Sequence, residues 1–468
     1  MRTSHDVAVI GLGPAGMAVS IMASHMGLKV VGIESRSLGG ECLSVGCIPS
    51  KALLRIASHR HRGGHLEPFG LSSDAVPRLG DPLNVVRQHV RFVIDEKTQK
   101  MFAKVDLKLG EGAASFVDPH TISVGQSSYS AKKIFVCTGT QPARPPIPGL
   151  RDTPHLTNET LFSLDRIPES LVVIGGGAIG CEMAQAFSRL GSRVSIVHMD
   201  LHLLPHGDPE AGELLGRVFE DEGIGVYNHR AIRSVAVDGA KVVVRTDRGE
   251  TLVGEKLLVA AGRVHDLAAL RLENAGVAYD ETGIRVDRFL RTTRRHIFAP
   301  GDVNGPPFFS HAAMHQGMIA LLNAILPRVL ARDVRKYVVP WTVFTDPPVA
   351  HVGKLEREIK AAGIDYEIIE ERYEDYGAAI AEGVGRGSVR AYVSPSGRIY
   401  GVRIVGEGAG EMINEWGLAI QQGLRIHRIM FLQHAFPSMS FLTKRVSERW
   451  MMKRMESPLL KRLIRLMF

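Results

Sequence analysis

Two cysteines near the amino terminus are the residues best suited to redox chemistry. Cys42 and Cys47 are separated by four residues in GGECLSVGCIPSKALL, which covers residues 39–54. Four intervening residues let the two sulfurs meet if the loop folds back on itself. Pro49 is typical of a first helical turn, so the segment predicts a helix that starts at Pro49 with Cys47 beside its amino end. The positive end of a helix favours a thiolate, which is the reactive form in disulfide exchange.

The other two cysteines do not extend this pair into a metal site. Zinc sites usually combine C-x2-C spacing with further Cys or His ligands. Cys137 and Cys181 instead lie singly in separate predicted elements. We predict that both are buried structural thiols and that the protein holds no metal.

A strand-turn-helix unit that occurs twice must position this chemistry. Each copy reads as an apolar strand, a G-x-G-x-x-G turn, a helix with apolar periodicity, a glycine and a second strand. This is the opening βαβ unit of a dinucleotide-binding fold, in which the glycines let the helix N-terminus meet a pyrophosphate. Two copies a domain apart are much stronger evidence than one. The turn glycines are Gly11, Gly13 and Gly16 in the first copy and Gly175, Gly177 and Gly180 in the second.

The two copies differ at the end of the second strand, where a carboxylate normally accepts hydrogen bonds from ribose hydroxyls. Glu34 supplies this carboxylate in the first copy, and His198 stands there in the second. Histidine neither repels nor strongly attracts a 2′-phosphate near neutral pH. No arginine occurs from His198 to His206, which favours NADH slightly and leaves NADPH open. A strand-end role for His198 without ligand contact is an equal alternative.

Later segments complete a fold of the α/β class. Residues 134–140 and 257–263 read as buried strands that end in small-residue turns, and residues 297–302 end a strand in Gly-Asp. We expect two Rossmann-like dinucleotide-binding domains and a carboxy-terminal α+β dimerisation domain. The predicted limits are 1–148 and 265–336 for the discontinuous FAD-binding domain, 149–264 for the NAD(P)-binding domain, 337–456 for the dimerisation domain and 457–468 for a tail.

The composition is that of a globular protein with several domains. Of the 468 residues, 45% are apolar and 23% are charged, and no stretch approaches the about 18 unbroken apolar residues of a membrane span. The few cysteines exclude a disulfide scaffold. The chain starts directly in an apolar strand with no signal-peptide core, so we expect a cytoplasmic protein.

Most of the net positive charge lies at the carboxy end. Residues 441–468 carry eight Lys or Arg against two Glu, which is +6 of the net +8, so we expect no nucleic-acid partner for the nearly neutral remainder. The tail predicts a short amphipathic helix that can lie on an anionic membrane or dock on its own or a partner subunit; we favour docking. Its basic stripe is Lys461, Arg462 and Arg465, and its apolar residues are Leu459, Leu460, Leu463, Ile464, Leu466, Met467 and Phe468.

The cysteine segment closely resembles the active-site signature of the class I pyridine nucleotide-disulfide oxidoreductases, FAD enzymes that include dihydrolipoamide dehydrogenase and mercuric reductase. The resemblance covers nearly the whole chain, because CTG at 137–139, IFAPGD at 297–302 and TDPPVAHVG at 345–353 also match. It implies a homodimer with FAD in the first unit and NADH or NADPH in the second. Electrons then pass through a Cys42–Cys47 disulfide to a small or protein-bound disulfide or dithiol.

The resemblance also implies individual roles. Cys47 is the flavin-proximal sulfur that forms the charge-transfer thiolate, and Cys42 exchanges with the substrate. Lys51 lies near the isoalloxazine ring and pairs with Glu182, and Asp302 holds the ribityl chain. An inert cysteine pair in a flavoprotein with another acceptor is the alternative. The residues expected at the cofactors are Gly11, Gly13, Pro14, Gly16, Glu34, Gly40, Lys51, Gly112, Thr138, Gly139, Asp302 and Ala312 for FAD, and Gly175, Gly177, Ile179, Gly180, His198 and Gly262 for the nicotinamide dinucleotide.

The chain departs from the family near its carboxy end. Disulfide reductases of the family carry a motif like HPT-x-SE, in which a histidine of the other subunit is the acid-base and the glutamate orients it. Aligned on the proline, Phe436 and Phe441 occupy these two positions, and phenylalanine can do neither job. His434 lies two residues upstream and either replaces the base or packs into the structure.

We favour an NAD(P)H:disulfide oxidoreductase similar to dihydrolipoamide dehydrogenase, with an atypical acceptor. A mercuric-reductase-like or quinone-type NAD(P)H reductase at a membrane is the alternative. No cysteine follows Cys181, however, so the carboxy-terminal cysteine pair of mercuric reductase is missing. A redox-sensing flavin-binding protein with little turnover is a third hypothesis.

Overall fold

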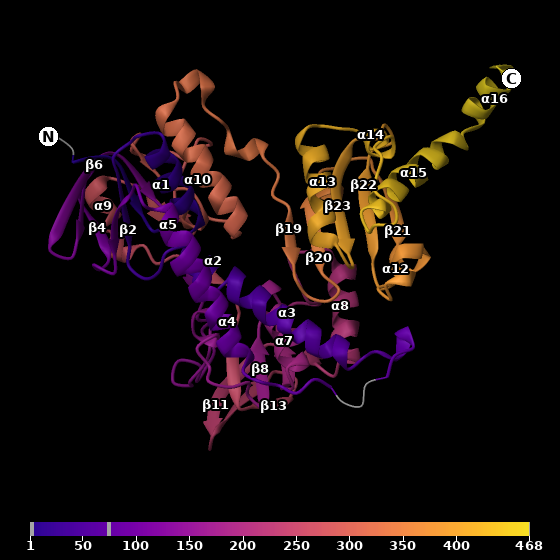
Figure 1. Cartoon of the computed structure of the whole chain (residues 1–468), viewed down its shortest axis with the longest axis horizontal. Helices are drawn as coiled ribbons and strands as arrows, with labels where there is room; N and C mark the ends of the chain where they lie inside the picture. The colour runs from indigo at the N-terminus through magenta and orange to yellow at the C-terminus, as the bar shows by residue number, and fades with distance from the viewer. Residues whose placement is uncertain (1–3, 73–75, 468) are drawn as a thin grey trace.

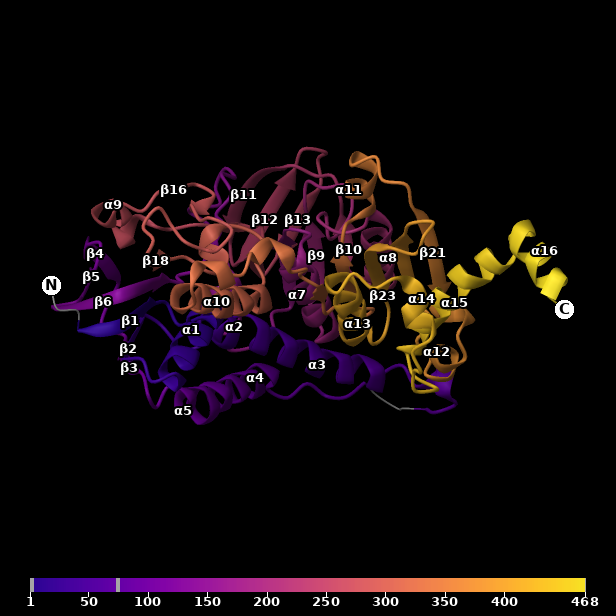
Figure 2. The same ribbon diagram turned by 90° about the horizontal axis from the view of Figure 1, so that it is seen from above.

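Two sheets dominate the chain before its carboxy-terminal domain: a mixed sheet with a parallel part, and a second sheet that is entirely parallel. A glycine-rich turn follows the first strand of each. The computed structural model describes residues 4–72 and 76–467. The two sheets and a separate antiparallel sheet lie along an elongated molecule, with the amino terminus at one end and the tail at the other (Figures 1 and 2). The predicted α/β class, with two dinucleotide-binding sheets and a carboxy-terminal α+β domain, is confirmed.

The first sheet has the strand order β3-β2-β1-β6-β5-β4, with β18 added beside β6. The strands β1 and β2 are short apolar runs that are almost completely buried, which is typical of parallel strands covered on both faces. The helices α1 and α10 pack closely because Gly317 leaves room for the backbone of Ala15. The elements are β1 (His5–Ile10), α1 (Pro14–His25), β2 (Val30–Glu34), α2 (Gly40–Ser44), α3 (Cys47–Gly63), α4 (Pro82–Arg91), a π-helix (Phe92–Thr98), α5 (Gln99–Met101), β3 (Asp106–Leu109), β4 (Ala114–Asp118), β5 (Thr121–Val124), β6 (Ser127–Val136), β7 (Gln141–Pro142), β18 (Ile297–Phe298) and α10 (Ser310–Ile325).

The second sheet has the order β10-β9-β8-β14 and is accompanied by an antiparallel sheet, β11-β12-β13. The helix α7 follows the second glycine turn and packs against α3, the helix that begins at Cys47. The cysteine segment is therefore carried on the second domain as well as the first. The elements are α6 (Asn158–Leu161), β8 (Ser170–Ile174), α7 (Ala178–Arg189), β9 (Arg193–Val197), α8 (Pro209–Asp221), β10 (Gly225–Tyr227), β11 (Ile232–Asp238), β12 (Lys241–Thr246), β13 (Thr251–Gly254), β14 (Lys256–Val259), β15 (Arg263–Val264), α9 (Leu272–Ala275), β16 (Tyr279–Asp280) and β17 (Gly283–Ile284).

The carboxy-terminal domain is an antiparallel sheet of order β19-β20-β23-β22-β21. The helix α13 packs on β20 and β23, and α15 packs on β21 and β22. Its core is built around the fully buried rings of Tyr373, Tyr392 and Trp416. The elements are β19 (Trp341–Val343), β20 (Val349–Gly353), α11 (Glu356–Ala361), β21 (Glu367–Arg372), α12 (Gly377–Ala381), β22 (Ser388–Val393), β23 (Ile399–Val405), α13 (Ala409–Gln421), α14 (Ile426–Met430), α15 (Phe441–Met455) and α16 (Pro458–Met467). The predicted domain limits stay a prediction.

The start of α3 differs from the sequence prediction. We expected the helix to begin at Pro49, whereas it begins at Cys47 and is already closed by the bond from the Ser50 N–H to the Gly46 carbonyl. Proline fits here because the N–H groups of the first turn have no partner within the helix. Cys47 is therefore the first residue of the helix.

The structure contradicts one of the two docking sites that we predicted for the tail, its own subunit; docking on a partner subunit stays a prediction. Docking on its own subunit is wrong for the described side chains, because α15 runs past the edge of the sheet and carries α16 away from the body (Figures 1 and 2). Phe468 and the side chains of Leu459, Leu460 and Leu463 lie outside the described residues. Within the described ranges, no helix has both the length and the apolar character needed to cross a membrane.

Candidate redox site

The structure brings Cys42 and Cys47 together as two free, half-buried thiols. Cys42 lies on the short helix α2, and Cys47 starts α3. The chain folds back between them at Gly46, where a Cβ atom would lie 2.8 Å from the Glu41 carbonyl oxygen. The two thiols lie close enough that each shifts the pKa of the other. The arrangement is that of a reduced pair that can close into a disulfide.

The two thiols differ in pKa, and Cys47 is the one that more readily becomes a thiolate. The neighbouring Cys42 lowers the pKa of Cys47 to about 6, helped by the Ser310 hydroxyl and the Lys51 ammonium and opposed by burial. The Ser310 Oγ lies 3.3 Å from the Cys47 sulfur. The neighbouring Cys47, together with burial, raises the pKa of Cys42 well above its usual value. At neutral pH the reduced pair therefore carries one proton, on Cys42, and one negative charge, on Cys47.

An ion pair fixes the lysine one turn into α3. The Lys51 ammonium lies 2.9 Å and 3.1 Å from the two carboxylate oxygens of Glu182 on α7. Glu182 is buried, and it also accepts a hydrogen bond from the Phe344 N–H in the carboxy-terminal domain. The ammonium lies 4.6 Å from the centroid of the Phe344 ring. This lysine therefore joins the cysteine helix to both other domains.

A second ion pair beside the cysteines was missed by the sequence analysis. Glu41, the neighbour of Cys42, lies 2.6 Å from the Arg263 guanidinium. Arg263 also donates to the Thr140 hydroxyl at 2.6 Å. The pair joins α2 to the strand that follows the second sheet, and no spacing in the sequence relates these residues.

The first glycine turn fits the adenosine and pyrophosphate of FAD. The buried Glu34 carboxylate accepts the Leu12 N–H and the Arg36 N–H, each at 2.8 Å, which holds it beside the turn with free lone pairs for ribose hydroxyls. Gly13 and Gly40 approach so closely that a Cβ on Gly40 would lie 2.8 Å from the Gly13 Cα. Because neither glycine has a side chain, a pyrophosphate can approach the backbone closely here.

Asp302 fits the polyol part of the same cofactor. Its Oδ1 is buried and has no hydrogen-bond partner among the described residues. Burial raises the pKa of the Asp302 carboxyl to about 6, against the opposing charge of Arg263. A buried carboxylate without donors is costly, and hydroxyl groups of a ribityl chain would satisfy it.

The second glycine turn fits a dinucleotide in the same way. A Cβ on Gly177, at the amino end of α7, would meet nothing within 4 Å, so the helix end is open to a pyrophosphate. The His198 ring lies under Gly176, and its Nε2 is 2.6 Å from the Asn228 Oδ1. Burial lowers the pKa of His198, which keeps the ring neutral at physiological pH.

The remaining predicted cofactor residues lie around the same two turns or in the elements that border them. Pro14 begins α1, Thr138 and Gly139 follow β6, and Ala312 lies in the first turn of α10. Gly11 faces the backbone of Cys137, which with Cys181 is buried as predicted. Gly112 precedes β4, Ile179 lies in the first turn of α7, and Gly262 precedes β15.

In the carboxy-terminal motif, the two phenylalanines contact each other, and the nearby His434 packs into its own domain. Phe436 is 72% exposed, and its ring contacts the Phe441 ring edge to face at 5.3 Å. The His434 side chain is only 4% exposed, and its Nε2 lies 3.1 Å from the Glu415 carboxylate. Its other ring nitrogen faces the Leu432 carbonyl at 3.3 Å. Both ring nitrogens are therefore engaged within the domain.

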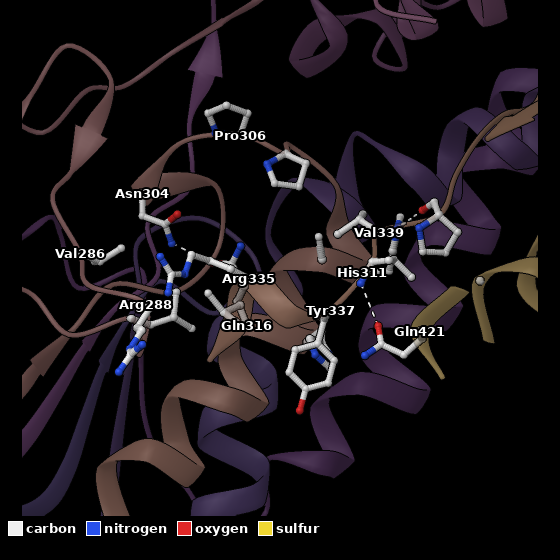
Figure 3. A pocket seen from close by; sticks show the side chains of 18 of the residues that line it. Val286, Arg288, Asn304, Pro306, His311, Gln316, Arg335, Tyr337, Val339 and Gln421 are labelled. Atoms are coloured by element: carbon white, nitrogen blue, oxygen red, sulfur yellow. Dashed lines mark hydrogen bonds between the residues drawn. The ribbon is translucent and has the colours of Figure 1, made fainter. Parts of the chain in front are cut away.

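A cavity of about 910 Å³ lies away from the cysteines, between α10 and α13 (Figure 3). The linker that crosses it is held on both sides, by His311 of α10 at the Pro340 carbonyl and by Gln421 of α13 at the Val338 N–H. Neither cysteine lines this cavity. The linker thus fixes the carboxy-terminal domain relative to the first sheet.

Ser310 is the residue that the sequence analysis missed at the reacting sulfur. It follows a Pro-Pro-Phe-Phe loop and begins α10, 263 positions after Cys47. The only sequence signal is its place at the start of a helix that follows the Gly-Asp turn. That signal predicts a helix cap as readily as a thiolate partner.

Family models, individual proteins and solved structures that are similar to this chain were all found. The family model for pyridine nucleotide-disulphide oxidoreductases matches residues 5–317, and the model for their dimerisation domain matches residues 339–445. A dihydrolipoyl dehydrogenase of Thermus scotoductus is 34% identical over 94% of this chain and 96% of its own length. A mercuric reductase of Acidithiobacillus ferrooxidans is 35% identical over 90% of this chain and 78% of its own. The HOCl-induced flavoprotein disulfide reductase RclA from Escherichia coli superposes with a TM-score of 0.84 at 27% identity, covering 95% of this chain and 99% of that one.

Proposed function

The chain belongs to the pyridine nucleotide-disulphide oxidoreductase family, and we propose that it uses NADH to reduce a disulfide through FAD and the Cys42–Cys47 pair. It is a flavin-dependent oxidoreductase of the type represented by dihydrolipoyl dehydrogenase, mercuric reductase and RclA. The observation that carries the proposal is the placement of two free, half-buried thiols on α2 and at the start of α3, with the Ser310 Oγ 3.3 Å from the Cys47 sulfur. FAD, when bound, accepts a hydride from the nicotinamide and passes an electron pair to a disulfide.

Three residues around the cysteine pair favour the thiolate form of Cys47. Ser310 donates a hydrogen bond to the Cys47 thiolate, and Lys51 adds positive charge on the same side. These contacts favour the thiolate that must remain after the disulfide opens. Glu182 holds Lys51 in place so that the ammonium does not swing into solvent.

Exchange with the acceptor starts at Cys42. Its sulfur attacks one acceptor sulfur, the acceptor S–S bond breaks, and the proton of Cys42 passes to the leaving thiolate, so that a mixed disulfide forms and one thiol is released. The Cys47 thiolate then attacks the Cys42 sulfur, which restores the Cys42–Cys47 disulfide and releases the second thiol. Two cysteines are oxidised and one acceptor disulfide is reduced to two thiols.

The first of these steps lacks the usual base. Phe436 and Phe441 stand where the family has its histidine and glutamate, and the ring nitrogens of His434 are occupied. Loss of a positioned base costs about 10²–10⁴ in rate. We therefore infer an acceptor disulfide whose own leaving thiol is acidic or which brings its own base, rather than free lipoamide.

NADH is the nicotinamide we propose. The buried, neutral His198 offers no positive charge to a 2′-phosphate, and the carboxylate of Asp200 lies 3.6 Å from its Nδ1. The nearby Arg230 is already paired with Glu250. We expect kcat/KM for NADH to exceed that for NADPH by at least about tenfold, the effect of about 1.4 kcal/mol.

A homodimer is the assembly we propose. The dimerisation-domain match supports it, as do the exposed apolar side chains of Met314 and Met318 on α10 and Leu418 on α13. Exposed apolar groups on neighbouring helices are typical of a surface that another subunit covers.

A thiophilic metal ion is a second candidate substrate. The chain is similar to mercuric reductases, and one related RclA structure is described as a Cu(II) complex. A thiolate and a thiol side by side are soft ligands for such ions. Among the described residues there is no group of three or more His, Cys, Asp or Glu side chains arranged to hold a metal. The ion would therefore be a transient substrate at the cysteines.

Replacement of the exchanging cysteine tests the proposal. We expect Cys42→Ser to lower NADH-dependent disulfide reduction at least about a thousandfold, because the attacking sulfur is lost. Flavin content and NADH oxidation by ferricyanide should be unchanged. Ser44→Ala, on the same helix α2, is the matched control and should keep full activity.

The acceptors to compare are lipoamide, oxidised glutathione, Cu(II) and a quinone. Turnover of Cu(II) alone, lost in Cys42→Ser, would favour the second candidate. Full disulfide turnover by Cys42→Ser would refute the role of the pair.

A further inference from the structure

The tail helix α16 has no role in the function proposed above. It spans ten residues, Pro458–Met467, and follows α15 at the far end of the molecule from the amino terminus. Both views show it projecting beyond the carboxy-terminal sheet (Figures 1 and 2). Its described side chains are exposed to solvent. Packing against its own subunit therefore does not explain why the helix combines basic and large apolar residues.

The charges of α16 differ from those of the helix before it. Four of the five basic side chains of α15 are paired with carboxylates: Arg445 and Arg449 with Glu371, and Lys453 and Arg454 with Glu367. Lys461, Arg462 and Arg465 of α16 have no carboxylate within ion-pair distance among the described residues. Three unneutralised cations on ten residues call for an anionic partner.

The other side of α16 is apolar and open to solvent. Ile464 is 43% exposed, Leu466 is 77% exposed and Met467 is 82% exposed. At about 100° per residue, the three cations fall within one quarter to one third of the helix circumference, and these apolar residues fall on the remainder. A helix that keeps cations on one side and large apolar groups on the other needs an anionic surface with an apolar phase below it.

We propose that α16 binds the surface of an anionic lipid bilayer, with its axis in the plane of the headgroups. Lipid phosphates would neutralise the cations, and the acyl boundary would take up the apolar side. A nucleic acid offers the anions but no apolar phase. The proposal does not depend on which acceptor the cysteines reduce; it concerns where the molecule carries out its reaction.

Vesicle sedimentation of the full-length, flavin-loaded protein tests this proposal. The probes are vesicles of phosphatidylcholine with phosphatidylglycerol and vesicles of phosphatidylcholine alone. We expect sedimentation with the anionic vesicles only, and weaker binding as salt rises. Reversal of the charges in K461E/R462E/R465E should weaken partitioning at least about a hundredfold, because each basic residue contributes to attraction by the surface.

Two further variants separate the lipid surface from other partners. I464S/L466S/M467S keeps the cations and should also lose binding, which a purely electrostatic partner such as nucleic acid would not predict. K104E/R151E/R248E changes the net charge equally at exposed positions elsewhere and should bind as the wild type does. NADH oxidation by ferricyanide should be the same for all variants, which checks that each one folds.

Several results would overturn the proposal. These are equal binding to both kinds of vesicle, no sedimentation at all, or an equal loss in the control variant. Deletion of residues 457–468 provides a further check. If the deletion changes the sedimentation velocity of the protein without lipid and the wild type does not bind vesicles, α16 docks on a second copy of the chain instead.

Discussion

Ser310 controls the thiolate more directly than any other residue outside the cysteine loop. Its hydroxyl lies 3.3 Å from the Cys47 sulfur and reaches it from α10, an element far from the cysteine loop in the sequence. A hydrogen bond to the charged form of an acid lowers its pKa. The position of one hydroxyl thus helps to set the fraction of reactive thiolate at a given pH.

Removal of this hydroxyl should shift the titration of Cys47. In the reduced wild type the thiolate predominates above pH about 6 and is lost as the pH falls through that value, because the pKa of Cys47 is lowered to about 6. We expect Ser310→Ala to raise this pKa by about one unit, the effect of one hydrogen bond to a charged group. The thiolate absorbance in the ultraviolet, followed against pH with Cys47→Ser as the blank, measures the shift.

Ser310→Thr is the control for that change, since it keeps the hydroxyl and should keep the titration midpoint. An unchanged midpoint in Ser310→Ala would mean that Cys42 and Lys51 alone stabilise the thiolate.

At the scale of elements, the amino ends of helices determine where anions and thiolates are placed. The helices α1 and α7 start at glycine turns, and α3 starts at Cys47. Each helix end presents unpaired N–H groups and a partial positive charge. The same physical feature therefore serves two dinucleotide sites and one cysteine.

Two glycines of the second turn should respond differently to a methyl group. A Cβ on Gly177 would meet no atom within 4 Å, whereas a Cβ on Gly180 would lie 1.9 Å from the Gly175 carbonyl oxygen. We expect Gly177→Ala to leave the melting temperature unchanged and to raise KM for NADH about tenfold, because the methyl occupies the pyrophosphate position. Gly180→Ala should lower the free energy of unfolding by about 2–4 kcal/mol, since the strand–helix packing must open.

Thermal unfolding and NADH titration of the two variants test this difference. An equal loss of stability in both variants would contradict an open helix end at Gly177. Unchanged NADH binding in Gly177→Ala would contradict the assignment of this turn to the nicotinamide dinucleotide.

At the scale of the whole molecule, the site depends on contacts between all three domains. Lys51, Glu182 and Phe344 come from the first sheet's domain, the second domain and the carboxy-terminal domain, respectively. Arg189 of α7 joins the second and third domains again, through Asp346 at 2.8 Å. Each pair has one buried partner, Glu182 or Arg189, and fixes the domains relative to one another. Removal of Lys51 would leave the buried Glu182 carboxylate without its counter-ion.

In the family, the acid-base histidine acts from the other subunit, so the missing base concerns the assembly rather than one domain. The rings of Phe436 and Phe441, which we propose to stand at the positions of the histidine and glutamate, contact each other. We expect F436H/F441E to raise turnover with lipoamide about 10- to 100-fold, since a positioned base contributes at least that much. Steady-state kinetics with lipoamide measures the effect.

The single variant Phe436→His should gain much less, because the glutamate that orients the ring is absent. Turnover that stays at the wild-type level in the double variant would show that something other than the base limits exchange. Sedimentation equilibrium should give the mass of a dimer for both variants.

The sequence determined the features that follow from local pattern. The glycine turns predict helices that begin at pyrophosphate sites, and Cys42 and Cys47 can meet because only four residues separate them. Apolar runs such as residues 7–10 and 171–174 predict the buried parallel strands. These features depend on interactions within about 30 residues, which sequence spacing describes directly.

The tertiary structure decided what depends on residues far apart in the chain. Ser310 reaches Cys47 across 263 positions, and Arg263 reaches Glu41 across 222 positions. The pKa of Cys47 is lowered first by the neighbouring Cys42, and Ser310, which tertiary structure alone brings to the sulfur, lowers it further. The direction of the tail also depends on tertiary packing. It follows from the path of α15 past the edge of the sheet, which the periodicity of the sequence does not predict.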